Sequence, residues 1–293
     1  MAAPTYMETI KRYDLHKDDY SKLHFEINDA KPYFEKNQKH ASVPHRHSFY
    51  QIIWFKKAGR HYVDYEILDH PENSIFFINK NQIHYFCNNA ANEGHLFHFN
   101  DVFINKYQQG IMERFLASIF NEIGSRYIKL STADTNKVRL LTSFIESEIR
   151  FKDLYYKEQV YHYFQNILFQ IERLRQKEAN IDFNVAKDYK LAVNFKKLIF
   201  DQIDAFYSID DYAHKLGTNA KTLTTISKNI LLDTPANIIK ESKILEAKRL
   251  LSNQKISIKE IAYSLGFEDP TYFTKYFKKG TGLTPKAFQK THL

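Results

Sequence analysis

A helical pattern that occurs twice near the C-terminal end constrains the fold more than any other feature. Residues 209–217, IDDYAHKLG, are followed 49 positions later by residues 258–266, IKEIAYSLG. Each copy precedes a polar, basic segment and then a Thr-Pro pair, at 234–235 and 284–285. The repeat predicts two similar helix pairs, and two helices joined by a short glycine-containing turn form a helix-turn-helix unit.

Small residues at matching positions indicate how each unit packs. Ala213 and Ala262 allow the first helix of a unit to approach the second closely. Gly217 and Gly266 are expected to end that first helix, because glycine adopts a positive φ without steric cost. We therefore predict a tight pair of helices in each unit.

The helices that follow these glycines are the predicted recognition helices, over residues 220–228 and 271–279. A longer helix over residues 235–251 is predicted between the units, with Pro235 in its favoured first turn. The C-terminal part should therefore be an all-α domain of two helix-turn-helix units joined by a long helix.

The positive charge of the chain is concentrated in this part. Residues 186–293 contain 18 Lys/Arg and 11 Asp/Glu, a net charge of +7, out of +8 for the whole chain. The 24 basic and 23 acidic residues before them nearly cancel. A basic module of this kind is what binding to nucleic-acid phosphates requires.

Residues 43–100 have a different pattern, which is typical of strands. Runs at residues 49–55, 61–67 and 74–78 are rich in β-branched and aromatic residues, and turn-forming residues separate them. Many short, closely spaced strands indicate a small barrel or sandwich. From about residue 110, apolar residues recur at helical spacing instead.

We therefore expect two domains. The first, residues 1–182, should be a β-barrel with packed helices from about residue 110, and the second, residues 183–293, should hold the helix-turn-helix units. Helices between a barrel and such a module pack on the barrel or on another copy of themselves. A homodimer through the helices of the N-terminal domain is therefore a hypothesis.

Residues 256–267, 272–279 and 281–285 closely resemble the AraC/XylS family of bacterial transcription regulators. The resemblance covers roughly residues 190–290 and implies that both recognition helices enter successive major-groove segments of double-stranded DNA. Matched by position, the base-reading sites of the family fall on Lys221, Thr224, Thr225, Thr271, Thr274 and Lys275.

The chemistry of these residues suits that role. Lysine can donate to O6 and N7 of guanine, and threonine offers a hydroxyl group and a methyl group that contacts thymine. Four further lysines are interpreted as phosphate contacts, namely Lys228, Lys278, Lys279 and Lys286. The alternative is that these lysines only solvate an exposed face. The first unit departs from the family pattern at Ser227 and Leu232, where the family usually has a phenylalanine and a glycine.

Residues 43–51 and 73–84 resemble a degenerate cupin pattern. His45, His47 and His84 match the histidines of metal-binding cupins, whereas Gln51 stands at the place of the acidic ligand. Three imidazoles could hold a transition metal with an open position, or they could line or brace a ligand cavity. We expect the cavity, and we predict no metal and no other cofactor.

A pocket for a small-molecule effector is predicted beside these histidines, because aromatic walls with a few polar groups form most small-molecule sites. The candidate lining residues are His45, His47, Tyr50, Trp54, Tyr62, His84, Phe86 and Phe97. A plain aromatic core is the alternative interpretation of each of them.

Cys87 is the only cysteine, which excludes an intrachain disulfide and is typical of a reducing cytoplasm. The first residues lack the pattern of a signal peptide, and no apolar run approaches membrane-spanning length. We therefore expect a cytoplasmic, DNA-binding transcription regulator that responds to an effector, and not an enzyme. The alternatives are a metal-dependent cupin enzyme fused to a DNA-binding module, and a constitutive regulator whose barrel serves only dimerisation.

Overall fold

The structure, a computed structural model, describes residues 10–17, 19–105, 119–120, 126–178, 186–253 and 256–291. It divides into two compact units, one within residues 11–181 and the other within residues 182–293. The first is rich in sheet and the second is helical, which confirms the predicted two-domain architecture at that level. The boundary predicted at residue 182 lies outside the described residues and stays a prediction.

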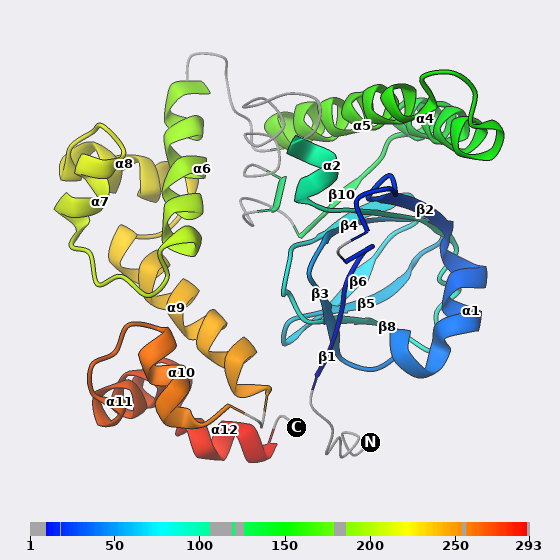
Figure 1. Ribbon diagram of the computed structural model, residues 1–293. Helices are drawn as coiled ribbons and strands as arrows, with labels where there is room; N and C mark the ends of the chain where they lie inside the picture. Colours follow the sequence, from blue (N-terminus) through cyan, green and yellow to red (C-terminus); the bar gives the residue numbers. More distant parts are fainter. Residues whose placement is uncertain are drawn as a thin grey trace. The chain divides into compact units, whose positions relative to one another are not determined.

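The described strands of the N-terminal unit form two five-stranded sheets (Figure 1). The first sheet consists, in order, of β1 (Lys11–Tyr13), β3 (His45–His47), β8 (His84–Phe86), β5 (Gly59–Val63) and β6 (Glu66–His70). The second consists of β10 (Tyr127–Lys129), β7 (Ser74–Ile78), β4 (Tyr50–Phe55), β9 (Gly94–Phe99) and β2 (Phe25–Asp29). β1 pairs with β3 in parallel, and the other described pairs are antiparallel.

A closed barrel is not confirmed, because no pairing among the described strands joins one sheet to the other. The sheets instead share an apolar core. Val63 and Phe86 of the first sheet pack with Phe55, Phe76 and other side chains of the second, and α1 (Ala30–Ala41) contributes Phe34. Side chains alternate between the two faces of a strand, so one face of each sheet points into this core.

Helices cover the other face of the second sheet. Trp54 and Phe97 from that face pack with Phe164 and its neighbours on α5 (Tyr156–Glu178), which lies beside α4 (Thr132–Phe151) in Figure 1. The short α2 (Asp101–Asn105) adds Phe103 to the same core. The helices expected from about residue 110 begin in a region, residues 106–118 and 121–125, that lies outside the described residues.

One predicted strand, residues 61–67, is wrong as a single element. The chain turns at residues 64–65, so β5 and β6 form a hairpin. Asp64 adopts a φ of 52°, and its carboxylate accepts hydrogen bonds from Gln82 and from the backbone N–H of Ile83. Aspartate tolerates this left-handed conformation better than most residues, which is why the turn occurs there.

The C-terminal unit contains seven described helices, in chain order: α6 (Ala186–Asp201), α7 (Ile209–Lys215), α8 (Ala220–Ile230), α9 (Pro235–Leu251), α10 (Ile258–Ser264), α11 (Pro270–Thr281) and α12 (Pro285–Thr291). The long α9 packs against α6 and α8 on one side of the repeat and against α10, α11 and α12 on the other. Among the helices that the structure describes, none has the length and apolar character needed to cross a membrane.

Matching local signals begin and end the first helix of each unit. Ser208 and Asp211 form a capping box at α7, and Ser257 and Glu260 form the same arrangement at α10. Both helices stop before a glycine with positive φ, 65° at Gly217 and 81° at Gly266. The repeat in the sequence is therefore a repeat in the backbone.

Candidate nucleic-acid interface and buried histidine cluster

The α8 helix separates an apolar face from a polar one. Leu223 and Ile226 are buried, and Leu223 belongs to a core that also contains Phe195 of α6 and Tyr212 of α7. Of the candidate contact residues on the polar side, Lys221, Thr225 and Lys228 are exposed and Thr224 is half-buried. The helix thus presents the side chains that the resemblance assigns to DNA.

The α11 helix has the same arrangement. Phe273 and Phe277 are buried, and the ring of Phe277 packs edge-on against Phe288 of α12 with centroids 5.5 Å apart. The candidate base contacts and phosphate contacts lie on the other side: Thr271, Lys275, Lys278 and Lys279 are exposed, Thr274 is half-buried, and Lys286 on α12 is exposed.

Two of the four threonines are already bonded to their own helix. The hydroxyl of Thr225 donates to the carbonyl of Lys221 at 3.0 Å, and that of Thr274 donates to the carbonyl of Pro270 at 2.9 Å. With the hydroxyl proton used in this way, the oxygen can only accept from a base. These two positions therefore favour a base amino group or the methyl group of thymine.

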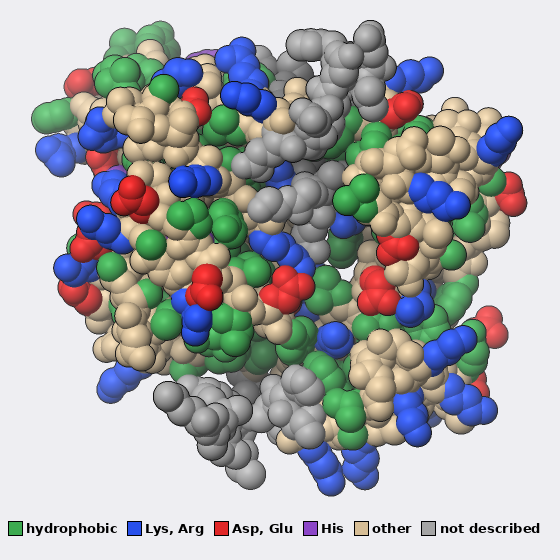
Figure 2. All heavy atoms as spheres, turned by 180° about the vertical axis from the view of Figure 1, so that it is seen from behind, with side chains coloured by type: hydrophobic (Ala, Val, Ile, Leu, Met, Phe, Trp, Pro, Cys, Tyr) green, Lys and Arg blue, Asp and Glu red, His purple; other side chains and the backbone are tan. Residues whose placement is uncertain are grey.

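The electrostatic character of this surface is basic. In Figure 2, Lys and Arg side chains gather over the part of the C-terminal unit that holds α10 to α12. Lys221, Lys228, Lys275, Lys278 and Lys279 make no ion pair with any described residue. Their charge is therefore available to phosphates.

Tyr272 was not predicted as a contact, although it lies exposed beside Thr271 on α11. Its ring is 5.9 Å from that of Phe267, which holds it at the edge of the recognition helix. Its position in the sequence, between the predicted contact residues Thr271 and Thr274, could have marked Tyr272 as a candidate contact.

A cluster of buried histidines occupies the space between the two sheets. The ring centroids of His45 and His84 are 4.5 Å apart, and both lie 4.9 Å from His47. Nε2 of His84 is 3.3 Å from Nδ1 of His47, and Nδ1 of His84 is 3.2 Å from Nε2 of His61. The structure therefore brings together the three predicted histidines and adds His61, which the prediction missed.

Burial keeps these imidazoles neutral. It lowers the pKa of His45 to about 4 and the pKa values of His47, His61 and His84 well below the usual range, because a buried charge loses its hydration. Neighbouring histidines act in the same direction. Neutral imidazoles are the form that binds a metal.

The donor set fits a transition metal. One nitrogen from each of His45, His47 and His84 lies within 4.8 Å of the other two. Nδ1 of His45 is 2.8 Å from the carbonyl of Val43, the backbone contact that commonly orients a metal-binding imidazole and leaves Nε2 as the ligand. Gln51 supplies no carboxylate to this set; its Nε2 lies 2.7 Å from Nε2 of His98, and its buried Oε1 has no hydrogen-bond partner among the described residues.

The eight residues predicted for the effector pocket do not share one face of the sheets. His45, His47, His84 and Phe86 lie between the sheets. Tyr50, Trp54 and Phe97 point the opposite way, toward the helices that cover the second sheet. Tyr62 stacks on Tyr85 with ring centroids 4.2 Å apart, on the outer face of the first sheet.

Comparisons with known proteins point to the C-terminal unit. A family described as a helix-turn-helix domain matches residues 212–291. Histidine kinase P4 of Formosa agariphila is 29% identical over 136 residues, which are 44% of this chain and 10% of that protein. The uncharacterized HTH-type transcriptional regulator YisR of Bacillus subtilis is 35% identical over 83 residues, 28% of this chain and 29% of that protein.

The alignment with the structure of ToxT from Vibrio cholerae covers 91% of this chain and 98% of the ToxT chain, with 16% sequence identity and a TM-score of 0.43. The chain spans only about a tenth to a third of the length of the curated relatives that it matches first. The matched residues run from within α7 to the end of α12 and include all of α8, α10 and α11. Over residues 212–291, the chain is therefore a helix-turn-helix domain of the AraC/XylS family.

Proposed function

We propose that the protein is a transcription regulator that binds double-stranded DNA through α8 and α11. The observation that carries this proposal is the pair of amphipathic helices, each with a buried apolar face and an exposed face of lysine and threonine. The similarity to YisR, an HTH-type transcriptional regulator, supports it. Each helix would enter one major-groove segment, with the two segments about 10 bp apart on one face of the duplex.

The exposed residues would divide into two groups. Lys221, Thr224, Thr225, Thr271, Thr274 and Lys275 would contact bases, and Lys228, Lys278, Lys279 and Lys286 would contact phosphates. Base contacts set sequence preference, whereas phosphate contacts raise affinity for every sequence and make it fall with salt. The two groups can therefore be separated experimentally.

The test is to select duplexes from a random pool with the full chain and to measure their binding by fluorescence anisotropy at several salt concentrations. We expect enriched sequences that bind at least about 1000-fold more tightly than random DNA. Lys279→Ala should lower the salt slope by about 1 without changing the selected sequence. Lys137→Ala, an exposed lysine on α4, is the matched control. No enrichment over random DNA would overturn the proposal.

The N-terminal unit would serve this regulator as a sensor and a dimerisation module. His45, His47, His84 and Phe86 remain candidates for contact with a small-molecule effector from the space between the sheets. Exposed apolar side chains on the α4–α5 hairpin, including Phe151, Leu154 and Tyr155, would be covered by a second copy. Sedimentation of the full chain and of Phe151→Glu tests the dimer, which the variant should dissociate.

A second candidate function, metal binding at His45, His47 and His84, is favoured by their convergence. Cobalt(II) is the probe, because its visible absorption spectrum reports tetrahedral nitrogen ligation. We expect one cobalt ion per chain, and none in His84→Ala, whereas the exposed histidine variant His162→Ala should bind normally. A metal-dependent enzyme would require this site, so metal-free protein that still binds DNA normally would argue for a regulator.

The protein would act in the cytoplasm, where its DNA is.

A further inference from the structure

The two helix-turn-helix units touch directly, in addition to being joined by α9. The backbone of Gly266, after α10, lies so close to that of Asp204, before α7, that a Cβ atom there would be 1.7 Å from the Asp204 carbonyl oxygen. Phe206 and Phe267 continue this contact, with rings edge-on and centroids 4.9 Å apart. We call the contact of residues 204–206 with residues 265–267 the inter-unit junction.

Lys243 of α9 lies beneath the inter-unit junction and bonds to both sides of it. Its side chain is 3% exposed. The ammonium group donates to the carbonyl of Ala205 at 3.2 Å and to the carbonyl of Leu265 at 3.1 Å. It also lies 3.8 Å from the ring centroid of Phe206 and 5.5 Å from that of Phe267, at cation–π distance. A single charged group on the connecting helix α9 thus bonds to a loop of each unit.

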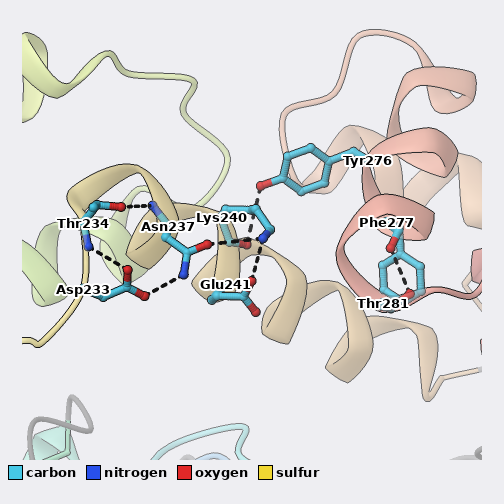
Figure 3. A network of polar contacts seen from close by, with 8 residues as sticks. All are labelled: Asp233, Thr234, Asn237, Lys240, Glu241, Tyr276, Phe277 and Thr281. Carbon is cyan, nitrogen blue, oxygen red and sulfur yellow. Dashed lines mark hydrogen bonds and ion pairs between the residues drawn. The ribbon is translucent and has the colours of Figure 1, made fainter.

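The connecting helix is also fixed to the second recognition helix. The Tyr276 hydroxyl of α11 donates to the backbone carbonyl of Lys240 at 3.5 Å, and Figure 3 shows this bond beside the polar chain from Asp233 through Asn237 to Lys240. At Gly280 a Cβ atom would be 2.8 Å from Ile244, so α11 crosses α9 in close contact. The direction of α11 relative to α9 is therefore set by packing.

Three contacts together determine how far α8 lies from α11. The first unit is attached to α9 by its own core, and the second is attached through α11. The inter-unit junction closes the remaining gap, and Lys243 provides hydrogen bonds to its two backbone segments. Burial lowers the pKa of Lys243 to about 8, so the group still carries its charge at neutral pH.

We propose that Lys243 is a positioning residue that holds the two helix-turn-helix units at one separation and thereby sets the spacing of the two DNA segments. The part of this proposal that concerns DNA rests on the proposed function. The fixed separation is a property of the protein alone, and it can be measured without DNA.

The first experiment measures the distance between the units by double electron–electron resonance. Spin labels are placed at Asn229→Cys on α8 and Lys259→Cys on α10, two exposed positions, in a full chain carrying Cys87→Ser. We expect one narrow distance distribution at pH 7. Lys243→Met, which keeps the length of the side chain and removes its charge and donors, should broaden that distribution at least twofold.

Two further variants separate positioning from general damage. Lys243→Arg keeps a cation with several donors and should restore the narrow distribution. Lys290→Met makes the same substitution at an exposed position on α12, away from the inter-unit junction, and should leave the distribution unchanged. Circular dichroism must show unchanged helix content in all variants. A distribution as narrow in Lys243→Met as in the parent would overturn the proposal.

The second experiment uses the duplex selected with the parent protein. Inserting 3 bp between its two bound segments rotates one segment by about a third of a helical turn relative to the other. We expect the parent to lose at least about tenfold in affinity and Lys243→Met to lose less than threefold. Equal losses would contradict the role in DNA spacing. If no duplex is selected, the proposed function fails, whereas the resonance result stands.

Discussion

Position 227 in α8 and position 277 in α11 are equivalent in the two helix-turn-helix units, yet a serine fills one and a phenylalanine the other. Both side chains are 0% exposed. The ring of Phe277 packs against Phe273 and Phe288, whereas the hydroxyl of Ser227 has no hydrogen-bond partner among the described residues. A buried hydroxyl without a partner is destabilising, so the first unit has the weaker core.

The helix ends differ in the same direction. After α11, Gly282 adopts a φ of 79°, and after α8, Leu232 adopts a φ of 59° with 85% of its surface exposed. The left-handed conformation has no steric cost for glycine but costs a residue with a Cβ atom about 1–2 kcal/mol. The first unit therefore stores strain where the second stores none.

The glycines that end the first helix of each unit show a third difference. A Cβ atom at Gly217 would meet nothing within 4 Å, whereas one at Gly266 would collide with the backbone of Asp204. Gly217 is needed for its positive φ alone, and Gly266 is needed also for the contact between the units. The two copies of the repeated pattern therefore differ in their roles. The second unit has the better-packed core, and of the two glycines only Gly266 takes part in the inter-unit junction.

The largest effect should come from weakening the second core. Phe277→Ala removes a ring packed on two other phenylalanines, and a fully buried phenylalanine contributes about 3–5 kcal/mol to the free energy of unfolding. Urea denaturation of the full chain, followed by circular dichroism, measures the loss. Ser227→Ala is the control at the equivalent position and should change stability by less than about 1 kcal/mol. A loss of less than 1 kcal/mol in Phe277→Ala would show that the two cores are alike.

The next effect concerns the inter-unit junction. Lys243 has an ordinary pKa of 10.5 that burial lowers to about 8, while the nearby Asp204 carboxylate raises it. Between these two pH values the unfolded chain holds a proton that the folded protein lacks. The free energy of unfolding should therefore rise with pH from 8 to 10.5, by up to about 3 kcal/mol from this group. A ¹³C NMR titration of the lysine side chains, with Lys243→Met to assign the signal, measures the pKa directly; a midpoint near 10.5 would refute the buried charge.

A smaller effect is expected in DNA recognition, at the equivalent positions Thr225 and Lys275. A lysine that contacts guanine contributes about 1–3 kcal/mol of discrimination, or about 5- to 150-fold in affinity. Lys275→Ala should therefore weaken binding to the selected duplex more than Thr225→Ala does. Lys278→Ala should weaken binding to all duplexes equally. If Thr225→Ala had the larger effect, the first unit would dominate recognition despite its weaker core.

The helical repeat could be predicted well because its determinants are local. Capping serines, glycines with positive φ and the spacing of apolar residues act within a few positions, and α8, α9 and α11 lie where these signals predicted helices. The convergence of His45, His47 and His84 was also foreseeable, from their spacing and from the family pattern. The assignment of DNA contacts to single residues stays a prediction.

The pocket could not be predicted in the same way, because composition does not tell which face of a strand is inward. Trp54 and Phe97 suit a pocket chemically, but the register of β4 and β9 directs them toward α5. The hairpin turn at Asp64 is a similar case, since it required the distant partners Gln82 and Ile83. Lys243 resembles a surface lysine in the sequence, and it is buried only because Ala205 and Leu265 meet in the fold.

The smallest effect tests the strain at the helix ends by reciprocal substitutions. Leu232→Gly should relieve about 1–2 kcal/mol of backbone strain, offset in part by the greater freedom of glycine in the unfolded chain, about 0.4–1 kcal/mol. A net stabilisation of about 0.5–1 kcal/mol is expected. Gly282→Ala should destabilise the second unit by a similar amount, and only through the backbone, because a Cβ atom there would meet nothing within 4 Å. Urea denaturation of both variants against the parent measures the two shifts. Shifts of the same sign would mean that the exposed side chain of Leu232, rather than its backbone conformation, decides the stability of the first unit.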